Sequence, residues 1–380
     1  MIKVTHVISD TGIGGAGIHL CNLLACADRQ TVSPSVILPK NSALIPRLVA
    51  LQVPVIEIKH GADRSTDLRA IPELTAMIHR THPHILHTHS AFYARIAGWL
   101  CQVPVAINTR HCADMTEYPS RITRTAIGLF ERCFGTHTIA TANYVKDVLM
   151  RYGTSPKSIT VIHNGSLPPP HLSKEEKKQL RAELGIEEKT FTVGMIARLA
   201  EGKGHETFLR AAKLCLSQNS SLRFLIAGSG ERENALRSLA HELAITDQVR
   251  FLGFRDDVGR IMNLLDINVN CSRRSETSSL SLSEGMSAGA VPVVTDCGGN
   301  AYMAGFGENG VVFPIDDHQA LADIILSLSR TPEQLASLSE KCKARFEKEF
   351  TAQVMTTATE ALYRQLLANP RKNLDIPPKI

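Results

Sequence analysis

Hydrophobic and polar positions along the first half of the chain follow two periods in turn. Short apolar runs of strand length, such as Ile2–Ile8, are followed by turns and by stretches with apolar residues at helical spacing, such as Ile18–Ala27. This succession predicts a parallel sheet with helices on both faces. The strands expected in this half are Ile2–Ile8, Val36–Leu38, Val53–Ile58, His84–His87, Val105–Asn108, Thr138–Ala140 and Thr160–Ile162.

A proline-rich segment then interrupts the pattern. Residues 164–173 contain three successive prolines, Pro168 to Pro170, which cannot continue a helix or a central strand. After a charged helix over Lys174–Leu184 the succession restarts, so we predict two doubly wound α/β domains, 1–168 and 169–351, that face one another across a cleft. The strands expected in the second domain are Thr192–Ile196, Leu222–Ala227, Val249–Leu252, Ile267–Asn270, Val291–Thr295 and Gly310–Phe313.

The composition is that of an ordinary globular protein and excludes several classes. The chain has 380 residues, of which 43% are hydrophobic and 21% charged, so it is neither collagen-like nor disordered throughout. No apolar run approaches the roughly 18 residues of a membrane-spanning helix, and the first residues lack the features of a signal peptide. The nine cysteines form no C-x-x-C pair, which favours a reduced, cytoplasmic protein without a zinc site. Residues 369–380 are expected to form a disordered tail.

Charge is unevenly distributed between the two halves. Residues 1–168 hold 16 Lys and Arg against 10 Asp and Glu, and 11 of the 15 histidines, whereas the remainder has a net charge of −1. A basic first half favours an anionic partner, either a phosphorylated ligand or an anionic lipid surface; solvated surface charge is the alternative. Nucleic acid is not expected, because no dense run of Lys and Arg is interleaved with aromatic residues.

Three groups of residues could carry chemistry. The glycine-rich turn 12–17 follows a strand and opens a helix, so its N–H groups could approach a phosphate, although a tight turn without a ligand fits as well. Arg198 and Lys203 share one loop after a strand and suit a diphosphate, with solvated surface cations as the alternative. Glu276 and Glu284 could accept hydrogen bonds from sugar hydroxyls; alternatively, Glu284 begins a helix and Glu276 is an exposed loop charge.

The order of these motifs resembles that of the retaining GT-B glycosyltransferases of the glycosyltransferase 4 type. The resemblance covers residues 1 to about 365. It departs from the family pattern at Thr277-Ser278, which leaves the sugar specificity open, and also at Ala301-Tyr302. The matching pieces are the glycine loop near residue 15, His87-Thr88-His89, Thr109-Arg110-His111, Asn164-Gly165, Arg198 with Lys203-Gly204, Gly228-Ser229-Gly230, Phe251-Leu252-Gly253-Phe254, Glu276 with Glu284, and Gly298-Gly299-Asn300.

The resemblance implies a GT-B fold, with a helix at about 352–368 that packs back on the first domain, and it implies residue roles. His111, Arg198, Lys203 and Glu276 are the implied catalytic residues. His87 and His89 end a strand and are assigned to the acceptor side, with a structural role as the alternative. No metal ion or other cofactor is implied besides the nucleotide-sugar co-substrate. The residues implied to bind the donor are Gly14, Gly15, Arg198, Lys203, Gly253, Phe254, Arg255, Val258, Ser278, Ser279, Leu280 and Glu284.

The activity implied is retaining transfer of a hexose-type sugar from a nucleotide-diphosphate donor to a glycan or lipid-linked acceptor, in surface polysaccharide or lipopolysaccharide synthesis. The alternatives are a nucleotide-sugar epimerase and a catalytically idle binding protein. The segment Arg121–Phe134 mixes basic and apolar residues at helical spacing. Such a helix either lies on the inner face of the cytoplasmic membrane or packs its apolar side on the domain core. His6, His82, His84 and His137 are expected to be structural.

Overall fold

The computed structural model describes residues 1–89, 91–111, 119–274 and 276–368. The chain forms two compact units. Unit 1 comprises Met1–Gly165 together with the chain from Ala352 onward, and unit 2 comprises Ser166–Thr351. The expected tail, 369–380, lies outside the described residues.

Unit 1 is built on a parallel sheet whose strands, where described, run in the order β3-β2-β1-β4-β5-β6-β7. The strands are buried on both faces, as in other doubly wound sheets. The strand order reverses between β1 and β4, which makes this pair the switch point of the sheet. The strands are β1 (Ile2–Ile8), β2 (Val32–Pro39), β3 (Val55–Ile58), β4 (Ile85–His89), β5 (Val105–Arg110), β6 (His137–Ala140) and β7 (Ile159–Val161).

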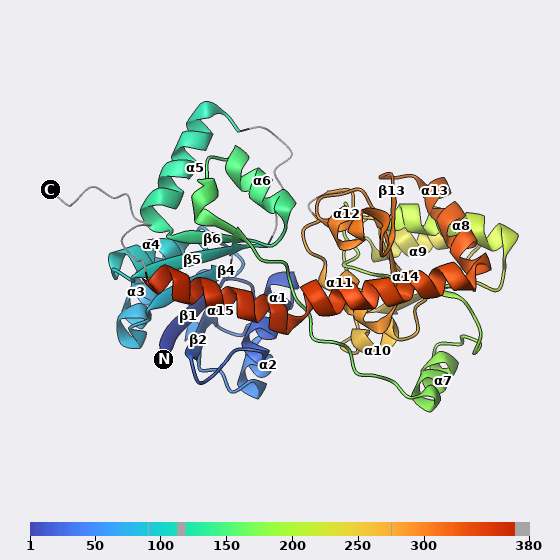
Figure 1. Ribbon diagram of the computed structural model, residues 1–380, viewed down its shortest axis with the longest axis horizontal. Coiled ribbons are helices and arrows are strands. Elements are labelled where there is room, and N and C mark those ends of the chain that lie inside the picture. The colour runs from blue at the N-terminus through green and yellow to red at the C-terminus, as the bar shows by residue number, and fades with distance from the viewer. Residues whose placement is uncertain (90, 112–118, 275, 369–380) are drawn as a thin grey trace. The chain divides into compact units, whose positions relative to one another are not determined.

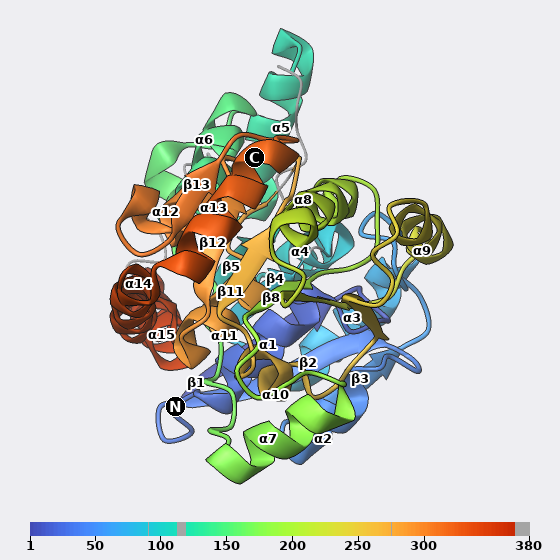
Figure 2. The same cartoon turned by 90° about the vertical axis from the view of Figure 1, so that its right-hand side faces the viewer.

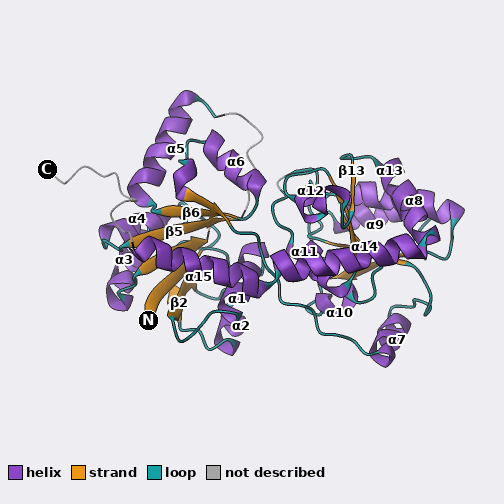
Figure 3. Cartoon of the chain, in the orientation of Figure 1, coloured by secondary structure: helices purple, strands orange, loops and turns teal. Residues whose placement is uncertain are grey.

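Helices cover both faces of this sheet (Figures 1 and 3). The C-terminal helix α15 belongs to unit 1 and packs beside α1, where the Thr356 hydroxyl donates to the carbonyl of Leu23 at 3.3 Å and the Glu360 carboxylate accepts from the N–H of Asp28 at 2.9 Å. These contacts bind the last helix to the first. The helices are α1 (Gly15–Ala25), α2 (Ile45–Ala50), α3 (Ala70–Thr81), α4 (Phe92–Leu100), α5 (Arg121–Phe134), α6 (Asn143–Arg151) and α15 (Ala352–Ala368), with a 3-10 turn η1 (Pro156–Ser158).

Unit 2 contains a second parallel sheet, in the order β10-β9-β8-β11-β12-β13. The switch point lies between β8 and β11, the equivalent pair to β1 and β4 of unit 1. The core is a continuous cluster of aliphatic and aromatic side chains on these strands and on the helices that cover them. The strands are β8 (Thr192–Ile196), β9 (Arg223–Ala227), β10 (Val249–Gly253), β11 (Ile267–Asn270), β12 (Val291–Thr295) and β13 (Val311–Phe313).

The helices of unit 2 also pack on its sheet, and α8 and α13 lie side by side (Figures 1 and 2). The first helix, α7, begins at a capping box in which Ser173 and Glu176 satisfy one another's backbone N–H groups. The helices are α7 (Lys174–Glu183), α8 (His205–Gln218), α9 (Glu233–Glu242), α10 (Val258–Met262), α11 (Leu280–Ala288), α12 (Asn300–Met303), α13 (His318–Arg330) and α14 (Pro332–Arg345), with a 3-10 turn η2 (Gly305–Gly307) and a π-helical turn η3 (Phe346–Phe350).

The predicted fold class, two doubly wound parallel α/β sheets, is confirmed. One helix start was wrong: Glu284 does not begin a helix, because α11 begins four residues earlier at Leu280, where the Ser279 hydroxyl accepts from the N–H of Leu282. The polar residues before Glu284 were assigned to a loop, so the true first turn of the helix was not predicted. No helix in the described ranges is long and apolar enough to cross a membrane.

Candidate functional site

The predicted donor-site residues of unit 2 lie at one edge of its sheet. Arg198 follows β8, Glu276 follows β11, and Gly253 ends β10. Because all these strands are parallel, their carboxyl ends share an edge, and β8 and β11 are the two strands of the switch point. Ligands of doubly wound sheets bind at this position. The topology therefore brings together residues that are far apart in the sequence.

Lys203 and Glu276 meet directly at this switch point. The Lys203 ammonium lies 2.9 Å from Glu276 Oε2, and the same oxygen accepts from the hydroxyl of Ser272 at 2.6 Å. Glu276 is 8% exposed, so burial raises its pKa, but the charge of Lys203 and the hydrogen bonds from Ser272 and Lys203 outweigh burial and leave the pKa below its usual value. Glu276 is ionised at neutral pH. The Lys203 side chain remains 30% exposed, and an ammonium has three N–H donors, so it can also contact a ligand.

Two glycines allow the loops around this pair to approach closely. Gly204 has a φ of +76°, and a Cβ there would lie 2.1 Å from the carbonyl oxygen of Cys271. Gly298 has a φ of +57°, and a Cβ there would lie 2.0 Å from the carbonyl oxygen of Glu276. The neighbouring N–H of Gly299 donates to that same carbonyl at 3.0 Å. Glycine is therefore required at both positions, because no other residue tolerates both the backbone angle and the contact.

Arg198 has a fixed backbone and an exposed side chain. The N–H of Leu199 donates to the carbonyl of Ser229 at 3.0 Å, and Gly228 and Gly230 pack against this backbone without room for a Cβ. The side chain is exposed, and within the described ranges it forms no ion pair. A guanidinium held this way can bind an anion without first breaking an existing contact.

The N-terminus of α11 places the remaining predicted residues of this region. Ser278 is buried, Ser279 caps the helix, and Leu280 is its first residue. Glu284 lies one turn beyond Leu280 on the same helix face, and both are half-buried. The start of α11 thus offers N–H groups and the positive end of the helix dipole near a carboxylate that can accept from hydroxyls.

The loop after β10 contains an exposed aromatic ring and an occupied arginine. Phe254 is 59% exposed, directly after Gly253. Arg255 donates two hydrogen bonds of 2.6 Å to the carboxylate of Asp257, so its charge is already neutralised. Val258 begins α10. Phe254 therefore fits a stacking surface for a nucleotide base better than Arg255 fits a phosphate ligand.

In unit 1, the glycine-rich turn leaves open space. Gly14 caps α1 and Gly15 is its first residue, and both are exposed. A Cβ at Gly15 would meet no atom within 4 Å, and one at Gly14 would only reach Asp10 Oδ2 at 4.0 Å. Unlike Gly204 and Gly298, these glycines are not required by packing, which is consistent with a backbone kept bare for a ligand.

Five histidine rings fill the switch point of unit 1. His6 lies on β1, His87 and His89 on β4, His19 on α1, and His111 directly after β5. Neighbouring ring centroids are 4.5–5.6 Å apart. We call this group the histidine array. Among the described residues, two groups of three histidines bring their ring nitrogens close enough together to share a metal ion, and both belong to the histidine array. They are His6, His87 and His89, and His19, His89 and His111.

Hydrogen bonds link the histidine array into a chain. His89 Nδ1 lies 3.1 Å from His111 Nε2, and His89 Nε2 lies 3.2 Å from His6 Nδ1. His87 is fully buried, and its two ring nitrogens are taken by the hydroxyls of Tyr363 at 2.6 Å and Thr109 at 2.7 Å. This geometry leaves His87 no nitrogen for an acceptor, so we correct its predicted acceptor-side role to a packing role. His89 is fully buried as well and contacts other histidines rather than a surface.

Burial keeps the rings of the histidine array neutral. Burial lowers the pKa of His6 to about 3 and that of His19 to about 4. Neighbouring His19 and Arg29 lower the His6 pKa further, whereas the hydrogen bond that His19 donates to the Asn164 amide oxygen opposes the shift at His19. The pKa values of His87, His89 and His111 are also well below the usual value, mainly because of burial. At physiological pH the array is therefore a set of uncharged imidazoles.

Sequence reasoning missed two residues of these sites. Ser272 holds Glu276, but a serine in a polar loop gives no signal of such a contact. His19 joins the histidine array, and its position one helical turn after Gly15 could have pointed to it, because residues four apart share a helix face.

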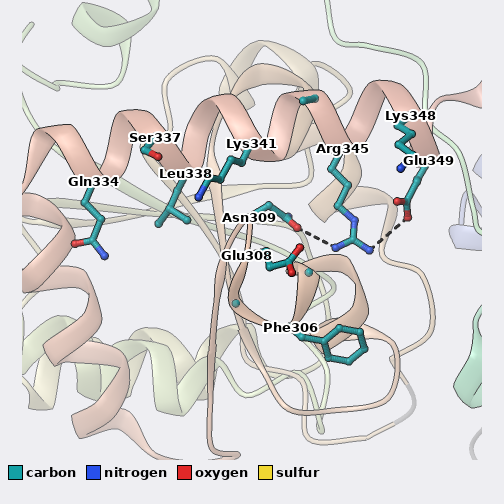
Figure 4. Close-up of a pocket in the computed structure, with 13 residues that line it drawn as sticks. Phe306, Glu308, Asn309, Gln334, Ser337, Leu338, Lys341, Arg345, Lys348 and Glu349 are labelled. Atoms are coloured by element: carbon teal, nitrogen blue, oxygen red, sulfur yellow. Dashed lines mark hydrogen bonds and ion pairs between the residues drawn. The ribbon is translucent and has the colours of Figure 1, made fainter.

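A separate hollow in unit 2 contains none of the predicted residues. It has a volume of about 930 Å³ and lies between α14 and the loop around η2 (Figure 4). Arg345 points into it and is held by Asn309 at 2.9 Å and Glu349 at 3.3 Å. Two lysines, Lys341 and Lys348, also line this hollow. We assign it no role in the site.

The fold defines a class of protein: two doubly wound α/β units, each with a switch point at the carboxyl ends of its strands. Solved structures share this fold. The crystal structure of Anabaena HepE in complex with UDP aligns with a TM-score of 0.83 at 19% identity, over 96% of this chain and 100% of that one. The profile described as Glycosyl transferases group 1 matches residues 176–345, and the profile described as Glycosyltransferase Family 4 matches residues 13–166.

The chain therefore belongs to the GT-B glycosyltransferases of the glycosyltransferase 4 type, and the resemblance seen in the sequence is confirmed. The putative glycosyltransferase EpsD of Bacillus subtilis is 32% identical over 187 residues, which are 48% of this chain and 49% of EpsD. The lipopolysaccharide core biosynthesis glycosyltransferase LpsE of Rhizobium meliloti is 26% identical over 189 residues, 50% of this chain and 53% of LpsE. The match thus spans about half the length of these curated relatives.

Proposed function

We propose that this glycosyltransferase is a retaining, metal-independent hexosyltransferase that uses a nucleotide-diphosphate sugar and extends a glycan or lipid-linked acceptor in surface polysaccharide or lipopolysaccharide synthesis. The observation that carries the proposal is the pairing of Lys203 with Glu276 at the switch point of unit 2, beside the exposed Arg198. The UDP complex of HepE and the printed role of LpsE support a nucleotide-sugar donor and a surface glycan.

The proposed chemistry needs stabilisation of the leaving group. As the bond between the sugar C1 and the diphosphate oxygen breaks, negative charge builds up on the diphosphate. Arg198 and Lys203 supply fixed positive charge where it develops, which removes the need for a metal ion at that position. Glu276 holds Lys203 in place and, with Glu284, accepts hydrogen bonds from the sugar and ribose hydroxyls.

The acceptor forms its new bond to C1 through a hydroxyl oxygen, and the proton of that hydroxyl passes to the departing diphosphate. In our proposal unit 1 presents this acceptor, with the open Gly14-Gly15 turn near the phosphates and His111 beside the donor sugar. His111 is half-buried, whereas the other four rings of the histidine array are buried, so it is the member most open to a ligand.

A panel of nucleotide sugars tests the proposal. The protein is incubated with each donor, with and without candidate acceptors, and released nucleoside diphosphate is measured. Acceptor-dependent release, with a product whose anomeric configuration by NMR equals that of the donor, supports the proposal. Conversion of the sugar without release would identify an epimerase instead, and no turnover with any donor would point to a binding protein. Full activity in a chelator is the expected result for a metal-independent transfer.

Helix α5 supports a membrane surface as the place of the acceptor. None of its residues is buried, and its apolar Ile122 and Leu129 are 83% and 59% exposed, next to the exposed Arg121 and Arg124. One side of the helix packs through Phe130, which stacks on Phe92 of α4 at 3.9 Å. An amphipathic helix with free apolar and basic residues suits an anionic lipid surface.

Liposome co-sedimentation tests whether α5 binds an anionic membrane surface. Binding to vesicles with anionic lipid is expected, weakened by salt, and reduced about tenfold or more in a variant with Arg121→Glu and Arg124→Glu. The charge-matched control is Arg210→Glu with Lys213→Glu, two exposed positions on α8. Absence of binding at low salt would instead indicate a soluble acceptor.

A further inference from the structure

We propose that unit 1 binds one transition-metal ion of the Zn²⁺ class through three residues of the histidine array, His19, His89 and His111. The proposed transfer reaction requires no metal, and the metal site shares only His111 with it. Three neutral imidazoles form a common protein site for Zn²⁺, with a further position open to water or another ligand. The proposal is based on four features of the array.

The first feature is proximity. One ring nitrogen from each of the three histidines lies within 4.8 Å of the other two. The distance of 3.1 Å between His89 Nδ1 and His111 Nε2 is close to the separation of about 3.3–3.4 Å between two imidazole nitrogens on a tetrahedral zinc ion with bonds of about 2.0–2.1 Å.

The second feature is that two of these rings already have the partners that metal-bound histidines use. His19 Nδ1 lies 2.9 Å from the amide oxygen of Asn164, and because this oxygen only accepts, Nδ1 carries the hydrogen and Nε2 keeps a lone pair. His89 can donate from Nε2 to His6 Nδ1 at 3.2 Å, which leaves a lone pair on its Nδ1. Such contacts on the far nitrogen orient metal ligands and fix their tautomer.

The third feature is the ligand type. The two metal-sized groups in the described residues consist of histidines alone, without a carboxylate. Nitrogen ligands favour Zn²⁺, Ni²⁺ or Cu²⁺ over Mg²⁺ and Ca²⁺, which prefer oxygen.

The fourth feature separates this set from the other possible one. The group His6, His87 and His89 is buried, and a metal there would have to replace one of the two hydrogen bonds of His87. The proposed set includes the half-exposed His111, which offers a route for the ion. His89 belongs to both groups, so only one of them can be filled at a time.

The test uses the full chain without an affinity tag, stripped with a chelator and dialysed against Zn²⁺. We expect one Zn²⁺ per chain by elemental analysis and calorimetry, no uptake of Mg²⁺, and a visible absorption spectrum typical of tetrahedral nitrogen ligands when Co²⁺ replaces Zn²⁺. His19→Gln should lose stoichiometric binding. The matched control is His137→Gln, a buried histidine on β6 outside the array, which should bind as the wild type does.

Two further variants keep the test decisive if His19→Gln does not fold. Asn164→Ala removes the orienting contact and should weaken Zn²⁺ binding by about 10–100-fold. His111→Gln changes the accessible end of the set and should abolish the Co²⁺ spectrum. A wild-type chain that retains no Zn²⁺, or His19→Gln and His111→Gln variants that bind it as tightly as wild type, would overturn the proposal and leave the array as hydrogen-bonded core.

Discussion

The two units share one topology but hold opposite chemistry at their switch points. In unit 2 the pair β8 and β11 brings together a permanent cation and an ionised carboxylate, Lys203 and Glu276. In unit 1 the equivalent pair, β1 and β4, brings together histidines that burial keeps uncharged. The same type of scaffold therefore holds an ion pair at one switch point and a cluster of uncharged imidazoles at the other. The architecture determines where a ligand binds, and the side chains determine which ligand it is.

Replacing Lys203 by alanine tests the proposed diphosphate site of unit 2 and should have the largest effect. We expect Lys203→Ala to lower kcat/KM for nucleotide release by about 10²–10³-fold, because a fixed charge on the leaving group is lost. Steady-state kinetics measures this, with circular dichroism to show that the fold is retained. Lys213→Ala, an exposed lysine of α8, is the control and should be unchanged. Wild-type turnover in Lys203→Ala would refute the diphosphate role.

Adding Zn²⁺ tests the metal site proposed for unit 1. If the transfer and the metal site are both as proposed, bound Zn²⁺ takes up the nitrogen of His111, and transfer should fall by about tenfold or more, since positioned groups of this kind contribute about 10²–10⁴-fold. Activity is measured at fixed donor with Zn²⁺ or Mg²⁺ added, and a chelator should restore it. Binding of Zn²⁺ without any change in rate would contradict the proposed role of His111 while leaving the metal site intact.

Acidification should weaken unit 1 before unit 2. Burial lowers the pKa of His137 to about 4, below the value near 6.5 of an unfolded chain. A depressed histidine pKa contributes stability that is complete above pH 6.5 and is lost as the pH falls toward 4. At pH 5, protonation of His137 in the unfolded chain alone should lower the free energy of unfolding by on the order of 1–2 kcal/mol. The histidine array lowers it further. In the described part of unit 2, the one histidine with a comparable shift is His205.

The loss of stability of unit 1 at low pH can be measured through the single tryptophan. Trp99 lies in unit 1, so its fluorescence reports the unfolding of that unit alone. Urea midpoints by tryptophan fluorescence should fall between pH 7.5 and pH 5, and His137→Gln should reduce the slope. A midpoint that does not change with pH would show that these histidines are not buried as described.

Two glycine substitutions, one in each unit, should have the smallest effects, and their effects on stability can be compared directly. Gly298→Ala in unit 2 should destabilise the fold by about 1–3 kcal/mol, because the residue has a positive φ and its Cβ would overlap the backbone of Glu276. Gly15→Ala in unit 1 meets no atom and should change stability by less than about 1 kcal/mol. Thermal unfolding compares them. Equal effects would mean that the unit 1 turn is a packing turn and is not kept open for a ligand.

Much of this organisation could be predicted from the sequence, for a physical reason. Strands of a doubly wound sheet are buried on both faces, so they appear as apolar runs, and β1, β8, β11 and β12 match the predicted ranges residue for residue. Because ligands bind after the carboxyl ends of such strands, placing Arg198 and Glu276 on one edge required only the strand pattern. The histidine array was not predicted, because its members pair across β1, β4 and α1, and residue spacing does not show which side chains meet between elements.

The central claim is that the switch point of unit 2 binds a diphosphate through Arg198 and Lys203. A crystal structure of the full chain with UDP or GDP tests it most directly. The account predicts diphosphate oxygens within hydrogen-bond distance of the Arg198 guanidinium and the Lys203 ammonium, with the ribose near Glu284. A nucleotide bound elsewhere, or bound with both side chains turned away from the phosphates, would contradict it.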